Sequence, residues 1–294
     1  MEEVAAGIYR IEAEIPKVDS VFAVYLIREG KGAIIEPGPT AILPAILEAM
    51  QRLGMKEAGY IIPTHIHLDH AGAAGNLSRL FPQAKVMVHP KGAKHLIDPS
   101  RLIESSRMAF GDDFEVLYGP ILPVAESQVK TPEDGEVLAI NDRKLRFIYA
   151  PGHAPHHMAI LDEKTMGLFS GEALGAPLRG AASSPIPMAA PPSFDIEVSL
   201  ETMERLRQLR PRLLFYSHDG VGTRPDELIS AAEENTRVFG DIILKSLQAG
   251  QSRPEITREI REHISRNLGV SGEGVELWMI VAGFIAYFQK KGLA

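Results

Sequence analysis

The chain contains no cysteine, and this absence limits the chemistry that it can carry. Without thiols there is no disulfide framework and no thiolate metal site. Any metal ion would therefore have to be bound by histidine, aspartate or glutamate.

Long hydrophobic runs are absent as well. The longest apolar stretch, residues 277–288, has 12 residues, whereas a helix that crosses a bilayer needs about 20. The first residues, Met1 to Glu3, lead into no apolar stretch of signal-peptide length. We therefore expect a cytoplasmic protein that does not bind membranes.

Basic residues are not in excess: 31 lysines and arginines stand against 38 aspartates and glutamates, which gives a formal net charge of −7. Such a chain lacks the electrostatic footprint of sequence-independent nucleic-acid binding. We expect a small-molecule substrate and no nucleic acid. The apolar content of 45% is ordinary for a globular protein with a sizeable core.

Short apolar stretches alternate with amphipathic ones through the first 224 residues, which predicts an α/β domain. Thr40 and Asp195 are predicted to cap two of its helices, and the proline- and alanine-rich segment 175–193 is predicted to be a loop. Strands are expected near 7–14, 21–27, 33–36, 60–63, 85–89, 145–150, 158–161, 167–170 and 213–216, and helices at 40–53, 69–80, 92–118 and 195–209.

Residues 225–294 have a different character, with helical periodicity over 226–249, 253–268 and 275–290. This predicts a helical C-terminal extension on a domain that spans 1–224. Its apolar positions, such as Phe284 and Phe288, are expected to pack on the domain or to form a homodimer interface.

Residues 64–70 read THIHLDH, so three histidines and an aspartate fall within six residues directly after a strand. His65 and His67 point the same way in extended backbone, and Asp69 and His70 follow where the chain should turn into a helix. Imidazole and carboxylate suit Zn²⁺, Fe²⁺ or Mn²⁺. The alternative is a solvated turn in which Asp69 caps a helix. A lone histidine would favour this alternative, but a cluster of three histidines and an aspartate does not.

This run resembles the Thr-His-x-His-x-Asp-His signature of the metallo-β-lactamase superfamily, and residues 71–77 resemble its glyoxalase II-like hydrolase branch. The family's later elements have counterparts in the right order. The resemblance covers about residues 5–220 and implies a four-layer αββα sandwich. These counterparts are Ala150-Pro151-Gly152-His153, Phe169-Ser170-Gly171-Glu172 and Tyr216-Ser217-His218.

The resemblance implies two divalent metal ions, with zinc expected first and iron or manganese as alternatives. Glu172 would bridge the two metals, and Asp69 would also help to position the hydroxide that attacks the substrate. The first metal would take His65, His67 and His153, and the second Asp69, His70 and His218.

Two positions depart from the family pattern, because Glu172 and Glu36 stand where the family has aspartate. Each side chain is one methylene longer. The residue at position 36 normally steadies the histidine loop without binding metal. We expect an intact site with different spacing, which leaves a preference for a metal other than zinc open.

For the other histidines, a structural or solvent-exposed role is the simpler interpretation. His157 is expected to donate or accept a hydrogen bond or to pack at a strand start, and His156 to lie outside the ligand set. His89, His95 and His263 are expected to be structural or exposed. Asp219 is either a turn residue or a group that touches substrate or orients His218.

The resemblance favours hydrolysis of an ester or thioester by a metal-bound hydroxide; a lactone or phosphoester stays open. A di-iron oxidoreductase is the second hypothesis, although such relatives usually carry glutamate at the position of His67 and a flavin domain. The acidic balance argues against a nuclease, and His70 against a true β-lactamase. A non-enzymatic metal-binding module is the remaining class.

Overall fold

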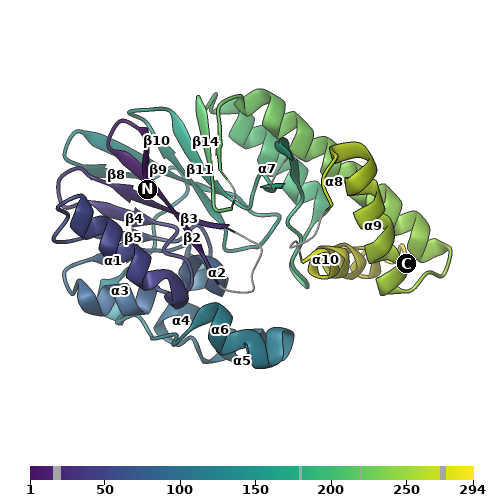
Figure 1. Cartoon of the computed structure of the whole chain (residues 1–294), viewed down its shortest axis with the longest axis horizontal. Coiled ribbons are helices and arrows are strands. Elements are labelled where there is room, and N and C mark those ends of the chain that lie inside the picture. The colour runs from purple at the N-terminus through teal and green to yellow at the C-terminus, as the bar shows by residue number, and fades with distance from the viewer. Residues whose placement is uncertain (16–20, 179–180, 219, 272–275) are drawn as a thin grey trace.

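A computed structural model describes residues 1–15, 21–178, 181–218, 220–271 and 276–294. Two β-sheets lie face to face, with helices on both outer sides (Figure 1). The first sheet has the strand order β1-β2-β3-β4-β5-β6-β7, and its last four strands are parallel. Its strands are β1 (Glu2–Ala5), β2 (Ile8–Glu14), β3 (Val21–Ile27), β4 (Ala33–Ile35), β5 (Tyr60–Ile62), β6 (Lys85–Met87) and β7 (Val129–Lys130).

The second sheet has the order β15-β14-β11-β10-β9-β8. β10 runs antiparallel to both β9 and β11, and β11 runs parallel to β14. Three of its strands, β9, β11 and β14, therefore end at the same edge. The strands are β8 (Val137–Ile140), β9 (Arg143–Tyr149), β10 (Met158–Asp162), β11 (Gly167–Gly171), β14 (Leu213–Tyr216) and β15 (Val221–Gly222).

The strand β3 shows why the sheets form the middle layers, since all seven of its residues are buried. Val24 and Leu26 pack in the cluster that includes Ile46 of α1. The alternate residue Tyr25 packs between the sheets, where its ring contacts Phe169 and Phe215. A strand with helices on one face and a sheet on the other has no solvent side, so its apolar run is continuous rather than alternating.

Helices complete the four layers. The helices against the first sheet lie in the connections between its parallel strands. The helix α7 and the first half of α8 cover the second sheet through residues such as Met203 and Ile229. The predicted αββα fold is confirmed. The helices are α1 (Leu43–Arg52), α2 (Leu68–Ala71), α3 (Ala74–Leu80), α4 (Pro90–Ile97), α5 (Ser100–Phe110), α6 (Phe114–Tyr118), α7 (Ile196–Gln208), α8 (Pro225–Gln248), α9 (Arg253–Leu268) and α10 (Leu277–Lys290).

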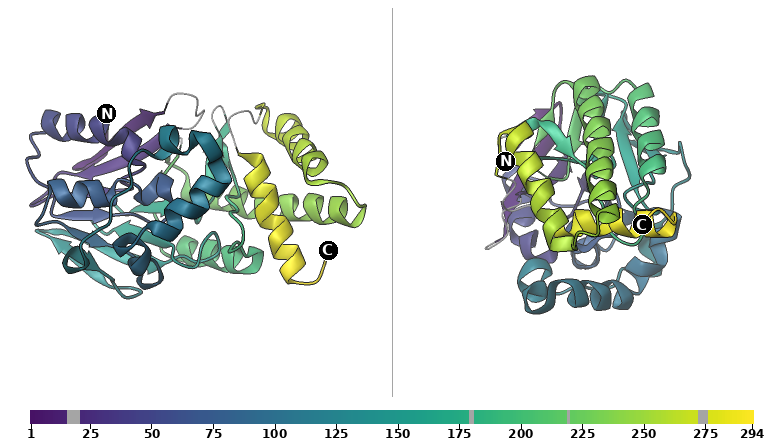
Figure 2. Two further views of the ribbon diagram at one scale, coloured as in Figure 1. Left: turned by 90° about the horizontal axis from the view of Figure 1, so that it is seen from below. Right: turned by 90° about the vertical axis from the view of Figure 1, so that its right-hand side faces the viewer.

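The C-terminal helices form their own apolar cluster at one end of the molecule (Figure 2). Phe239 and Ile243 in the second half of α8 pack with α9 and α10, and Phe284 of α10 packs on Phe194. Because α8 contributes to this cluster and to the second-sheet core, it joins the extension to the sandwich. Within the described ranges, no helix combines the length and the apolar content needed to cross a membrane.

Segment 175–193 differs from its prediction as a loop, because β12 (Ala176–Leu178) and β13 (Ala181–Ile186) pair as a two-stranded antiparallel sheet. Prolines led to the wrong prediction. Each strand of a two-stranded sheet has a free edge, where a residue without an N–H is tolerated.

Three helix predictions were correct in place but wrong in detail. The helix predicted from Thr40 begins at Leu43, after a 3-10 turn, and the Thr40 hydroxyl instead donates to the Gly72 carbonyl at 3.1 Å. The helix predicted for 69–80 is interrupted between α2 and α3, and the one predicted for 92–118 divides into α4, α5 and α6. Gly111, with φ of +55°, ends α5.

The predicted cap of α7 is confirmed, since the Asp195 carboxylate accepts a hydrogen bond from Val198 N at 3.2 Å. Replacing Asp195 with alanine leaves that N–H without its partner and should lower the free energy of unfolding by about 1 kcal/mol. Denaturant titration measures this, with Glu201→Ala on an exposed position of the same helix as the control. Equal losses in both variants would show that the cap is not the cause.

Candidate metal centre

The motif residues stand at the carboxyl ends of two parallel neighbours, β4 and β5. Glu36 follows β4, while Thr64 and His65 follow β5, so the topology brings them to one edge of the first sheet. Across the interface, His153, Glu172 and His218 come after β9, β11 and β14, whose ends share one edge of the second sheet. The bond from Met158 N to Thr64 O, 2.8 Å long, ties the two edges together.

The first group consists of His65, His67, His153 and Glu172. The Nδ1 of His67 lies 2.9 Å from His65 Nε2 and 3.0 Å from His153 Nε2. The Nδ1 of His153 donates its hydrogen to the Met188 carbonyl at 2.8 Å, which directs Nε2 inward, where it would offer a lone pair in the neutral ring. Three imidazole nitrogens that converge in this way fit a shared cation.

The second group consists of Asp69, His70, Glu172 and His218. The Nε2 of His70 lies 3.0 Å from Asp69 Oδ2 and has no hydrogen-bond partner. His218 Nε2 is 3.7 Å from the same carboxylate oxygen. An inward-facing nitrogen and carboxylates in one buried place again suit a metal ion of the kind that nitrogen and oxygen ligands bind.

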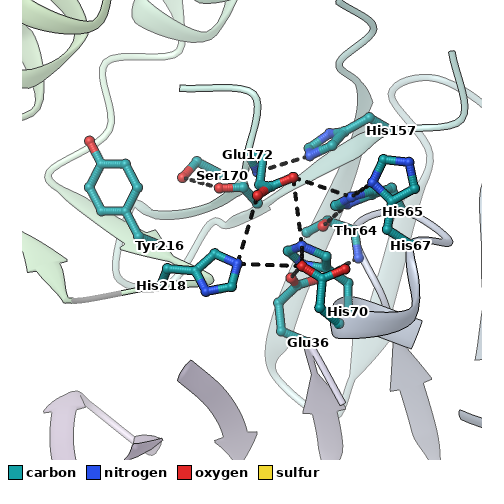
Figure 3. A network of polar contacts seen from close by, with 12 residues as sticks. Glu36, Thr64, His65, His67, His70, His157, Ser170, Glu172, Tyr216 and His218 are labelled. Carbon is teal, nitrogen blue, oxygen red and sulfur yellow. Dashed lines mark hydrogen bonds and ion pairs between the residues drawn. The ribbon is translucent and has the colours of Figure 1, made fainter. Parts of the chain in front are cut away.

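Glu172 lies between the groups (Figure 3). Its Oε2 is 2.9 Å from His153 Nε2 and 3.5 Å from His65 Nε2, whereas its Oε1 is 3.7 Å from His218 Nε2. The structure thus brings together all seven residues singled out in the sequence. The longer side chain reaches both groups, as a bridging carboxylate must.

Glu36 steadies the histidine loop from behind, as the resemblance implies. Its carboxylate accepts a hydrogen bond from Thr64 N at 2.6 Å and pairs closely with His70 Nδ1. The Thr64 hydroxyl in turn contacts His65 Nδ1 at 3.1 Å. Each of the two histidines is therefore fixed on its outer nitrogen, which leaves Nε2 directed inward.

The pKa shifts of His65, His67 and Glu172 suit metal binding. Burial, together with the neighbouring His153, lowers the pKa of His67 to about 4, and burial together with His70 lowers the pKa of His65 well below its usual value. Both rings are therefore neutral near pH 7. Burial opposes ionisation of Glu172, but His153 and His70 outweigh it and hold the pKa of this carboxyl below its usual range. Neutral imidazoles and ionised carboxylates are the forms that bind cations.

His157 has the hydrogen bond expected of it, because its Nε2 accepts from Glu172 N at 3.1 Å. His156 stacks over His65 with ring centroids 6.2 Å apart and belongs to neither group. His89 is structural, since its Nδ1 accepts from Lys91 N at the start of α4. Asp219 lies outside the described residues.

Two contributors to the site could not be inferred from residue types. The carbonyl that orients His153 belongs to Met188, and any residue can supply a backbone carbonyl. Glu276, just before α10, lies close enough to Asp69 and Glu172 that burial and these two carboxylates raise its pKa to about 7. The sequence separation from the motif exceeds 200 residues, and no local pattern marks it.

Gly171 sets the direction of Glu172, with φ of +54°. An added Cβ would lie 2.5 Å from both His157 Nε2 and the Thr64 hydroxyl. Gly171→Ala should therefore cost about 1–3 kcal/mol in unfolding free energy and weaken metal binding. Gly250→Ala is the matched control, because Gly250 also has positive φ (+78°) but open space around it. If both variants bind metal equally, crowding at position 171 is unimportant.

Comparisons with known proteins bear on the family and the fold of the chain. The model of the metallo-β-lactamase superfamily matches residues 17–218. A metallo-β-lactamase fold-containing protein of Sulfurisphaera tokodaii is 32% identical over 165 residues, which cover 55% of this chain and 60% of the relative, less than two thirds of its length.

Two further likenesses are more distant. An atrochrysone carboxyl ACP thioesterase of Aspergillus fumigatus is 23% identical over 166 residues, covering 55% of this chain and 38% of that protein. The crystal structure of a metallo-β-lactamase family protein from Thermus thermophilus superposes with a TM-score of 0.72 at 20% identity, over 98% of this chain and 95% of the other. From the family match and the shared fold, the chain belongs to the metallo-β-lactamase superfamily.

Proposed function

We propose that the protein is a binuclear metallo-hydrolase of the glyoxalase II-like branch that cleaves an ester or thioester. One observation carries this proposal: the Glu172 carboxylate lies near both ligand groups, with Oε2 2.9 Å from His153 Nε2 and 3.7 Å from His70 Nε2, and with Oε1 3.7 Å from His218 Nε2. A single metal would leave one group of inward-facing ligands without a cation.

The residues divide into two sets of ligands. Zinc is the first expectation for a nitrogen and oxygen set without thiolate, and iron or manganese suits it as well. When bound, the cations supply Lewis acidity and lower the pKa of a water molecule. The ligands are His65, His67 and His153 for one metal, Asp69, His70 and His218 for the other, and Glu172 for both.

Asp69 has a second role in this proposal. Its side chain is 28% exposed, whereas those of His70 and Glu172 are almost fully buried. It therefore faces the side from which water and substrate approach. Its carboxylate accepts a hydrogen bond from the attacking water and orients it toward the carbonyl carbon.

The thioesterase among the relatives supports acyl transfer to water as the reaction class. Nothing in the ligand set requires a serine nucleophile. His67 favours hydrolysis over di-iron oxygen chemistry, because the resemblance places glutamate at this position in the oxidoreductases.

The test uses protein reconstituted with zinc, manganese or iron, whose metal content is measured, on a panel of activated esters and thioesters. We expect about two metals per chain and hydrolysis that a chelator abolishes. Oxygen consumption by the iron-loaded protein without hydrolysis would favour the oxidoreductase. If no metal-loaded form hydrolyses any compound of the panel, a non-enzymatic metal-binding module is favoured.

A further inference from the structure

The imidazole of His153 is held by a backbone carbonyl from a distant part of the chain. Its Nδ1 donates to the Met188 carbonyl at 2.8 Å, and His153 is 5% exposed. Met188 belongs to the 187–195 segment, which connects β13 to α7 and is irregular. Protein interiors are close-packed and transmit displacements from one element to the next. The position of the Met188 carbonyl therefore depends on the elements that pack against this segment.

Helix α10 of the C-terminal extension packs directly against the 187–195 segment. Its Gly283 is buried, and a Cβ added there would lie 2.5 Å from the Ala189 carbonyl oxygen and 2.7 Å from the Ala189 carbonyl carbon. These distances are far shorter than van der Waals contact, so only glycine allows the two backbones to approach so closely. Ala189 directly follows Met188. Gly283 therefore contacts the peptide group next to the one that holds His153.

Further contacts join the same segment to the extension at one side and to the ligand loop at the other. The Phe194 ring lies 4.7 Å from the ring of Phe284, the residue after Gly283. Asp195 N donates to the Gly152 carbonyl at 3.0 Å, one residue before His153. α10 lies on the side of the extension that faces the sandwich (Figures 1 and 2). The segment thus connects α10 to the first ligand group.

We propose that Gly283 is a positioning residue for the first metal: α10 sets the place of the Met188 carbonyl and, through it, the direction of His153 Nε2. The proposal rests on the metal site proposed above, and it gives the C-terminal extension a part in assembling that site. His65 and His70 are held instead by Thr64 and Glu36, which follow strands of the first sheet. A disturbance at Gly283 should therefore affect one metal more than the other.

The Gly283→Ala variant of the full chain tests the proposal in zinc titrations. Its methyl group pushes the Ala189 backbone away, and the Met188 carbonyl moves off His153 Nδ1. We expect the affinity for one of two zinc ions to fall about 10–100-fold, as when a metal-bound histidine loses the partner behind it. The other zinc ion should keep the affinity that it has in the parent. Calorimetry with a competing chelator measures both constants.

Gly240→Ala is the matched control, because Gly240 is also a buried glycine inside a helix of the same extension. The three atoms nearest to a Cβ added there are side-chain atoms of Ile196, Phe284 and Phe288, at 3.4, 3.6 and 3.9 Å. Both substitutions raise the helix propensity equally. Gly240→Ala should bind both zinc ions as the parent does. Equal losses in the two variants, or parent-like zinc binding by Gly283→Ala, would overturn the proposal.

Aromatic residues of α10 give a second pair of variants, which decides the question if Gly283→Ala does not fold. Phe284→Leu loosens the contact with Phe194 without a clash, so the same zinc ion should be bound more weakly, by a smaller factor. Phe288→Leu is its control, since the Phe288 ring contacts Phe284 and Tyr287 within α10. Loss of zinc affinity to the same degree in both leucine variants would contradict a specific path through the segment.

Nitrogen NMR of the imidazoles provides a readout that needs no metal. In the metal-free protein, hydrogen exchange at His153 Nδ1 should be about tenfold faster in Gly283→Ala than in the parent, because the bond to the Met188 carbonyl is lost. If the parent binds no zinc but this exchange is accelerated, the metal site proposal fails and the positioning by α10 stands. If zinc binds and neither exchange nor affinity changes in Gly283→Ala, the positioning fails and the metal site stands.

Discussion

Replacing Glu172 with glutamine is expected to lower cation affinity by about 3–5 kcal/mol, or roughly 10²–10⁴-fold, and to abolish most hydrolysis. The amide keeps the shape of the side chain but carries no negative charge. Two divalent cations held a few ångströms apart repel each other, and the carboxylate between them offsets this repulsion. Glu172 belongs to both candidate ligand groups, so in the proposed site it is the residue whose charge both cations would share.

Metal content after dialysis and kcat with a saturating ester measure the two losses separately. Glu172→Asp is the informative companion, because it restores the carboxylate with one methylene fewer. We expect it to bind more metal than the glutamine variant. Glu201→Gln, on the exposed side of α7, should leave both values unchanged. A glutamine variant that keeps two metals and full activity would show that Glu172 does not bridge.

The first half of the site was predictable because its residues are local. His65, His67, Asp69 and His70 fall within six positions after an apolar strand, and their spacing alone indicates a shared cavity. His153 and His218 are different, since each is only a histidine near the end of a strand. Their meeting depends on strand order in the second sheet, which became predictable only through the family's order of motifs.

Features that depend on tertiary contacts were not predictable in the same way. Thr40 has the residue type of a helix cap, yet its hydroxyl donates to the Gly72 carbonyl because the chain after α2 returns to that place. The pairing of β12 with β13 is concealed by prolines at Pro177 and Pro185. The contact of Phe110 with Trp278 joins residues 168 positions apart (278 − 110), and apolar periodicity does not specify such a partner.

The second large effect is expected at Glu36, which binds no metal in this proposal. Glu36 is 3% exposed, and its carboxylate accepts from Thr64 N and pairs with His70 Nδ1. Glu36→Ala leaves both groups buried without their partner, which should cost about 3–5 kcal/mol of unfolding free energy. Backbone strain does not contribute to this difference. Position 36 has φ of +56°, and alanine has the same conformational penalty there as glutamate.

The same substitution should weaken cation binding by about 10–100-fold, because His70 loses the group that fixes its ring and the Thr64 loop loses its anchor. Glu36→Gln separates the two roles, since its amide oxygen still accepts from Thr64 N while the charge beside His70 is gone; we expect an intermediate loss. Unfolding of the metal-free protein gives the stability term, and metal titration gives the affinity. Glu48→Ala, on an exposed position of α1, should stay within about 0.5 kcal/mol of the parent. If Glu36→Ala binds metal as tightly as Glu48→Ala, the histidine loop holds its geometry without support from β4.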